Sequence, residues 1–121
     1  MELLQVALHA DDLDRAAAFY TQLLGTEPAG RFDPPGLLFF RVGRVRILVE
    51  RGAPPALVYF EVPDLEAALA RVPESAERLG EPQRIFTHTD DSLGPAGTEE
   101  WHAGFRDPDG NLVVLVALLP A

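Results

Sequence analysis

Apolar and polar residues follow one order twice along this chain. Residues 3–25 begin with a strand-like apolar run, continue into Asp-Leu and an Ala-rich stretch, and end at Leu-Gly, and residues 57–80 repeat this order. Within both Ala-rich stretches the apolar residues recur every three to four positions, which predicts helices that bury one face. The recurring positions are Leu13, Ala16, Ala17, Tyr20 and Leu24 in the first copy and Leu65, Ala68, Leu69 and Val72 in the second.

The predicted helices carry start and stop signals. Asp12 and Asp64 stand where N-cap residues belong, because a carboxylate there accepts hydrogen bonds from free backbone N–H groups of the first turn. Gly25 and Gly80 are interpreted as C-terminal stops. Pro73 is expected to end the second regular helix early.

Three strands are predicted after each helix, at 27–32, 37–42, 45–50, 82–88, 99–106 and 111–118. The last two are joined by an Asp-Pro-Asp-Gly turn, and 89–98 is interpreted as an open loop with a solvated Asp90-Asp91 pair. Together with the leading strand, each half becomes a βαβββ unit. We therefore expect an α+β domain of two tandem modules, 1–51 and 57–121, with 52–56 as the linker.

Pairing two such units covers their sheets and leaves a cleft between them. The run Leu37-Leu38-Phe39-Phe40 is apolar throughout, so that strand is expected to be covered on both faces, by a helix or by a second chain.

The amino-acid composition excludes several classes of ligand and of catalytic chemistry. The formal net charge of −9 disfavours nucleic acid and leaves room for a cationic ligand. All ten basic residues are Arg, which excludes a Schiff-base lysine, and the absence of Cys excludes disulfides and thiolate zinc sites. The first residues turn acidic early and no apolar run reaches the ~18 residues of a membrane span. A cytoplasmic protein without membrane contact is expected.

The stretches HADDLDRAAAFYTQLLG and FRDPDGNLVVL, set in a duplicated βαβββ chain, resemble the vicinal oxygen chelate superfamily. That superfamily includes glyoxalase I, bleomycin-resistance proteins, extradiol dioxygenases and methylmalonyl-CoA epimerase. The resemblance covers essentially the whole chain. It implies a curved mixed sheet around a central cleft and a homodimer.

In metal-dependent members of this family, four inward side chains, usually His or Gln, Glu, His and Glu, hold a divalent cation. The resemblance places these positions at Gln5, at Ile47 or Leu48, at Leu57 and at Val114. Only Gln5 offers a ligand atom, and a neutral amide alone binds a divalent ion poorly. No metal or other cofactor is therefore expected. The alternative is one divalent metal ion in a displaced site built from His9, Glu50, Glu61 and His102.

Strand alternation places Gln5 and His9 on one face of the first module, and Leu57, Tyr59 and Glu61 on the equivalent face of the second. We expect a cleft that binds a small, cationic or aromatic molecule, with Glu50 and Glu61 recognising a basic group. The alternative is an enzyme of the lyase, epimerase or dioxygenase kind, for which His9, Glu61 and His102 are the catalytic candidates, including a metal-free His9–Glu61 acid–base pair. The full set of candidate binding residues is Gln5, His9, Glu50, Leu57, Tyr59, Glu61, Trp101, His102 and Val114.

Overall fold

The structure, a computed structural model, describes residues 1–121 and contains the duplicated order of elements that the sequence predicts. The first half comprises β1 (Gln5–His9), α1 (Leu13–Leu24), β2 (Gly30–Phe32), β3 (Leu37–Val42) and β4 (Val45–Glu50). The second half comprises β5 (Leu57–Glu61), α2 (Leu65–Ala70), β6 (Glu77–Arg78), β7 (Gln83–Thr87), β8 (Thr98–Arg106) and β9 (Leu112–Pro120). The mixed α+β class is confirmed, and β6 is a short addition that no pattern predicted.

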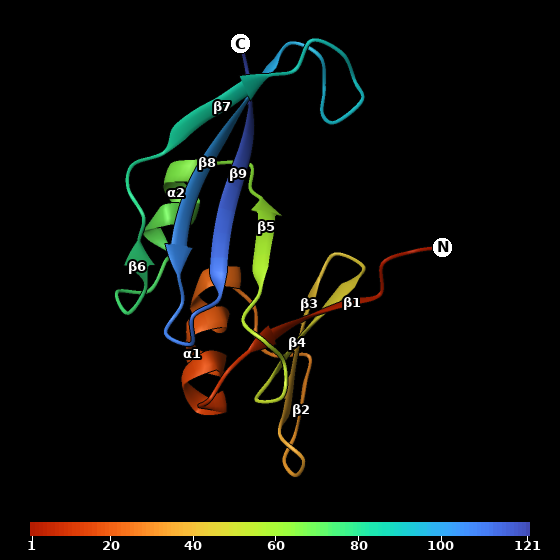
Figure 1. The fold of residues 1–121 in the computed structure, drawn as a ribbon, viewed down its shortest axis with the longest axis vertical. Helices are drawn as coiled ribbons and strands as arrows, with labels where there is room; N and C mark the ends of the chain where they lie inside the picture. The colour runs from red at the N-terminus through yellow and green to blue at the C-terminus, as the bar shows by residue number, and fades with distance from the viewer.

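The strands form two sheets with matching topology (Figure 1). Sheet A has the order β1-β4-β3-β2, and sheet B has the order β5-β9-β8-β6 with β7 also paired to β8. In each sheet the leading strand runs parallel to the last one, β1 with β4 and β5 with β9, while the other pairs are antiparallel. The two halves therefore build the same βαβββ pattern in two adjoining sheets, and not in one continuous sheet.

Local signals explain where the helices begin and end. The Asp12 carboxylate accepts from the N–H of Arg15 and the Asp64 carboxylate accepts from the N–H of Ala67, so both predicted N-caps are confirmed. Gly25 ends α1 with a φ of 69°, a left-handed conformation that favours glycine. The second helix ends at Ala70, just before Pro73.

One expectation about local structure was wrong, and another is met within the chain only in part. Gly80 does not stop a helix, because α2 ends ten residues earlier and Gly80 lies between β6 and β7. Within the chain one face of β3 is fully covered: Leu38 and Phe40 are completely buried, whereas Leu37 and Phe39 on the opposite face remain half-buried. Strand alternation, together with a single layer of helix over sheet A, accounts for this difference. Cover of that second face by a second chain stays a prediction.

One apolar core is shared by the two halves. Phe19 and Tyr20 of α1 pack against Phe105 of β8 and Phe40 of β3, with ring centroids 6.2 Å apart in both pairs. Residues from both helices and both sheets belong to the same buried cluster. The helices thus cover one face of each sheet, and the opposite faces are left for binding. Neither helix is long and apolar enough to cross a membrane.

A buried polar cluster joins the halves at the Asp-Pro-Asp-Gly-Asn turn between β8 and β9. Asn111, which is fully buried, accepts from the backbone N–H groups of His9 and Ala56 and donates to the His9 carbonyl and the Asp107 carboxylate. Asp107 also accepts from the hydroxyl of Tyr20 at 2.5 Å. Burial and the adjacent negative charge of Asp107 raise the pKa of Tyr20, so its hydroxyl stays a donor.

The same turn is fixed from outside by α1. Asp109, whose side chain is 2% exposed, pairs with the Arg15 guanidinium and accepts from the backbone N–H of Asp11 at 3.0 Å. Hydrogen bonding and the charge of Asp109 raise the pKa of Arg15. The first half of the chain therefore holds this turn at two points, through His9 to Asn111 and through Arg15 and Asp11 to Asp109.

Replacing Asn111 by Ala is expected to lower the free energy of unfolding by roughly 3 kcal/mol or more, because buried donors and acceptors from three segments lose their partner. Urea denaturation followed by circular dichroism measures this change. The control is Gln22→Ala, which removes one exposed side-chain hydrogen bond to the Arg71 carbonyl and should cost less than about 0.5 kcal/mol. Equal effects of the two changes would contradict the joining role of Asn111.

Candidate functional site

An open cleft of about 460 Å³ lies on the uncovered face of sheet B. It contains three of the candidate residues, Tyr59 and Glu61 on β5 and His102 on β8. Its remaining lining comes from one carboxylate and from apolar side chains, namely Glu100, Leu93, Val116 and Leu118. The cleft is therefore apolar in its walls and acidic in its polar groups.

Strand register explains how these side chains meet. Val116 of β9 pairs with Glu61 on one side and with His102 on the other, so the three lie in one row across the sheet. Glu100 lies two residues before His102 and shares its face. The Tyr59 and His102 rings meet edge to face with centroids 5.6 Å apart.

Glu100 holds two imidazole rings at once. One of its oxygen atoms lies 2.6 Å from Nε2 of His102, and the other lies 3.0 Å from Nε2 of His88. The His88 side chain is 2% exposed, the Glu100 side chain 18% and the His102 side chain 22%. Because an ionised carboxylate only accepts hydrogen bonds, both rings present Nε2–H to it.

The charge of Glu100 follows from this contact. Burial on its own disfavours the ionised form, but the hydrogen bonds from His102 and His88 outweigh it, and the pKa of Glu100 is lowered. The carboxylate is thus ionised at neutral pH. Sequence reasoning identified His102, and it noted His88 at the end of a strand as one of three histidines available to a non-standard site, but it missed Glu100. The available signal was the alternation of Glu100 and His102 along one strand, with His88 immediately after the neighbouring strand.

His9 is not in this cleft, and the structure does not bring it together with Glu61. Its Nδ1–H donates to the carbonyls of Ala53 at 2.9 Å and Arg51 at 3.1 Å, and Nε2 lies 2.9 Å from the Asp11 carboxylate. Desolvation lowers the pKa of His9, but the carbonyl of Ala53 and the charge of Asp11 raise it more, so the net shift is upward. The ring is a contact between β1 and the linker.

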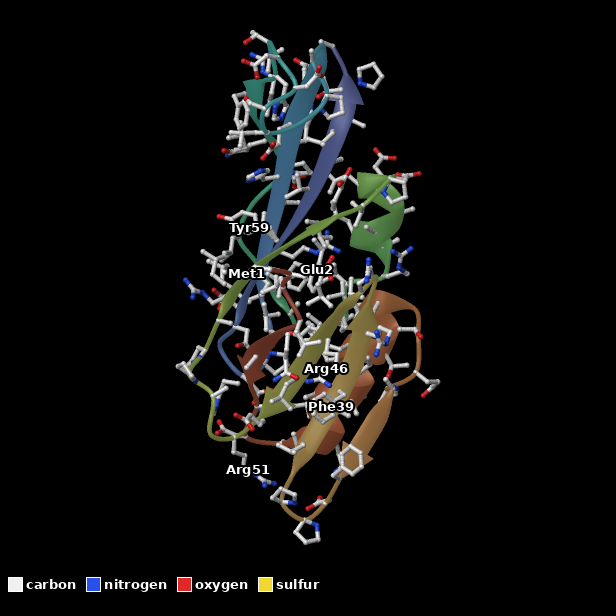
Figure 2. All side chains as sticks on the ribbon, turned by 90° about the vertical axis from the view of Figure 1, so that its right-hand side faces the viewer. Met1, Glu2, Phe39, Arg46, Arg51 and Tyr59 are labelled. Carbon is white, nitrogen blue, oxygen red and sulfur yellow. The ribbon has the colours of Figure 1, made fainter.

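The side chain of Gln5 accepts a hydrogen bond from an arginine of the same sheet. The Arg46 Nε–H donates to the Gln5 side-chain oxygen at 3.0 Å, and the guanidinium lies over the Phe39 ring, 5.6 Å from its centroid. Figure 2 shows Arg46 and Phe39 on sheet A, apart from Tyr59 on sheet B. The candidate ligand atom of Gln5 is therefore already occupied by a positively charged donor.

The other positions at which the resemblance places metal ligands carry apolar side chains. Ile47 belongs to the shared core, and Leu48 is buried on the face that carries Gln5. Leu57 lines a hollow of about 420 Å³ beside β1, whose lining residues are all hydrophobic. Val114 lines a separate hollow that it shares with His102, outside the cleft. No group of three or more His, Asp or Glu side chains is arranged to hold a metal ion. The displaced set of His9, Glu50, Glu61 and His102 is not assembled.

Two further candidates lie away from the cleft. Glu50 ends β4 on sheet A, paired with His9 and Leu37. Trp101 alternates with His102 along β8 and shares the side of the buried Ala103, so it does not line the cleft. Asp90 and Asp91, expected to be solvated, also shape their loop by accepting from Ser92 and Ala96.

Comparisons with known proteins agree with this architecture. Residues 2–115 match the family model of the Glyoxalase/Bleomycin resistance protein/Dioxygenase superfamily. No curated protein sequence gives a significant match.

Several solved structures share the fold. An integron cassette protein from the mobile metagenome of V. Cholerae superposes with a TM-score of 0.72 at 19% identity, covering 97% of this chain and 94% of that one. A lactoylglutathione lyase from Agrobacterium tumefaciens superposes with a TM-score of 0.67 at 23% identity, covering 96% of this chain and 92% of that one. A glyoxalase/bleomycin resistance protein from Albidiferax ferrireducens T118 superposes with a TM-score of 0.65 at 21% identity, covering 95% of this chain and 98% of that one. The chain belongs to the Glyoxalase/Bleomycin resistance protein/Dioxygenase superfamily.

Proposed function

We propose that this protein binds a small organic cation with an apolar or aromatic body in the cleft of sheet B, without the help of a divalent metal. The observation that carries the proposal is the chemistry of the cleft lining. Its charged groups are the carboxylates of Glu61 and Glu100, its walls are apolar, and no Arg lines it. Glu61 is exposed and makes no ion pair within the chain, so its charge is available to a ligand.

The apolar hollow beside Leu57 is a poorer candidate, although its volume is similar. All nine of its lining residues are hydrophobic, so it offers no polar group to orient a ligand. Specific sites combine apolar walls with a few placed polar groups, and of these two spaces the cleft of sheet B is the one that does so. Tyr59 lines both spaces and forms the boundary between them.

The metal-free part of the proposal is supported by Arg46. A divalent cation at Gln5 would approach a fixed guanidinium and compete with it for the same amide oxygen. The remaining family positions supply no oxygen or nitrogen donors. The proposed binding of a ligand in the cleft therefore uses no metal ion.

A cation-selective cleft should discriminate between ligands of equal shape and opposite charge. Benzamidine is expected to bind measurably in ligand-observed NMR and calorimetry, and benzoate is not. Glu61→Gln should weaken benzamidine by about fivefold, as expected for one exposed ion pair of about 1 kcal/mol. Glu74→Gln, which removes an exposed charge outside the cleft, is the control. Equal binding of both ligands, or equal effects of both variants, would refute the assignment.

Metal challenge tests the second part. Protein purified without chelators and titrated with Zn²⁺, Ni²⁺, Mn²⁺ or Fe²⁺ is expected to show neither stoichiometric uptake nor a rise in melting temperature, since three of the four family positions are apolar. Elemental analysis and thermal melts measure this. One tightly held equivalent that stabilises the fold would overturn the metal-free assignment.

We further propose that a second copy of the chain covers the exposed apolar strip beside β1 and β5, giving a homodimer. Leu3, Leu4, Leu57 and Tyr59 are each more than half exposed, and such strips on monomers commonly mark interfaces. The uncovered faces also differ in charge. Arg41 and Arg46 lie opposite each other on β3 and β4 of sheet A, whereas Glu61 and Glu100 lie on sheet B. The proposed contact is therefore confined to the apolar strip, which leaves the carboxylates of the cleft to the ligand.

Size-exclusion chromatography with light scattering is expected to give twice the mass of the chain. Leu57→Glu should shift it toward the monomer, because it places a charge in the apolar strip, while Glu66→Gln on the exposed side of α2 should not. A monomeric wild-type protein at micromolar concentration would contradict the dimer.

A further inference from the structure

We propose that His102 is the general base of a metal-free proton-transfer site, with Glu100 and His88 as the residues that position it. This inference uses the same cleft as the proposed function and adds an activity to it. None of the family's metal positions takes part.

The orientation of His102 leaves one ring nitrogen for chemistry. Nε2 is committed to Glu100 at 2.6 Å, while Nδ1 makes no hydrogen bond within the chain. In the neutral ring with Nε2–H, Nδ1 carries the lone pair. A carboxylate at Nε2 both selects this tautomer and stabilises the positive charge that appears when Nδ1 takes a proton. The ionised state of Glu100, derived above, supports this role.

The other two histidines lack this arrangement. Both ring nitrogens of His9 face acceptors, the carbonyls of Arg51 and Ala53 on one side and Asp11 on the other. His88 is too deeply buried to meet a ligand. Among the three histidines of the chain, only His102 combines a carboxylate partner, a free Nδ1 and a place in the lining of the cleft.

His88 is fixed from behind, which makes Glu100 a rigid partner. A Cβ added at Gly94 would lie 2.8 Å from Cε1 of His88, so the loop backbone packs directly on the ring. The same loop is closed by backbone hydrogen bonds from His88 to the Thr98 carbonyl and from Gly97 to the His88 carbonyl, both at 2.8 Å. Glu100 thus receives one hydrogen bond from an immobile donor and directs its other oxygen at His102.

The strand register sets the spacing between the two polar groups that a substrate would meet. Glu61 and His102 flank Val116 on adjacent strands, so their backbones are about 10 Å apart at a strand spacing of ~4.8 Å. A substrate would carry a basic group for Glu61 and, roughly one aromatic ring away, a carbon whose hydrogen is acidified by a neighbouring carbonyl. Nδ1 takes that proton, the C–H electron pair moves into the enolate, and His102 returns the proton to the opposite face of the same carbon after the enolate has turned over in the open cleft, which inverts the configuration of that carbon. This isomerisation needs no co-reactant.

A general probe of such a base is 5-nitrobenzisoxazole. The proton on C3 moves to Nδ1, the C–H electron pair forms the nitrile, and the N–O bond breaks to release a coloured phenolate. His102→Gln is expected to lower kcat/KM on the order of a hundredfold, the usual contribution of a general base. His9→Gln is the matched control and should leave the rate unchanged, with thermal melts confirming that both variants fold. A His102→Gln rate equal to that of the wild type would overturn the proposal.

The positioning role of Glu100 has a spectroscopic signature. Long-range ¹H–¹⁵N spectra of the wild type should show His88 and His102 as Nε2–H tautomers. Glu100→Gln presents an amide that can donate, so it should alter the His102 tautomer and lower the rate, while Glu100→Asp should restore part of both. An unchanged tautomer and an unchanged rate in Glu100→Gln would remove Glu100 from the mechanism.

The two proposals for this cleft fail separately. His102-dependent turnover of the uncharged probe without benzamidine binding would overturn cation recognition and leave the base in place. Benzamidine binding that depends on Glu61, with no His102-dependent turnover, would leave a binding protein and overturn the base.

Discussion

The fully buried side chain of Asn111 is the constraint on which the arrangement of the two sheets depends. A buried amide must satisfy its donors and acceptors within the protein, and the partners of Asn111 come from β1, from the linker and from its own turn. Asp107 extends the same network to Tyr20 of α1. Moving one sheet against the other would leave several of these groups unpaired, so the relative orientation of the halves, and with it the position of each uncovered face, is set by this turn.

Given that orientation, two copies of one fold unit present different chemistry. On sheet A the uncovered face carries a guanidinium that stacks on Phe39 and binds Gln5. On sheet B the corresponding face carries carboxylates and an imidazole around the apolar floor of Val116. In metal-dependent relatives one ion draws ligands from both halves, as the family resemblance implies. Here the two uncovered faces carry side chains of opposite charge.

The three histidines show how surroundings assign different roles to one residue type. His9 is held on both ring nitrogens and joins β1 to the linker. His88 is buried and serves as a fixed donor to Glu100. His102 shares that carboxylate, but it faces the cleft with one nitrogen free. The three side chains are chemically identical, so residue type alone does not separate a structural contact from a candidate base.

The sequence by itself determined the elements, their duplicated order and the family, because helix caps, apolar periodicity and turn residues act over short distances along the chain. It also determined that the side chains of Leu57 and Val114 are apolar. Only the tertiary structure decided which polar side chains meet. His9 and Glu61 occupy equivalent strand positions, yet they lie on different sheets, and Trp101 turns to the side opposite its neighbour His102. Glu100 and His88 meet because β7 and β8 pair around the loop that joins them, a contact that depends on strand register and on loop packing that no local pattern encodes.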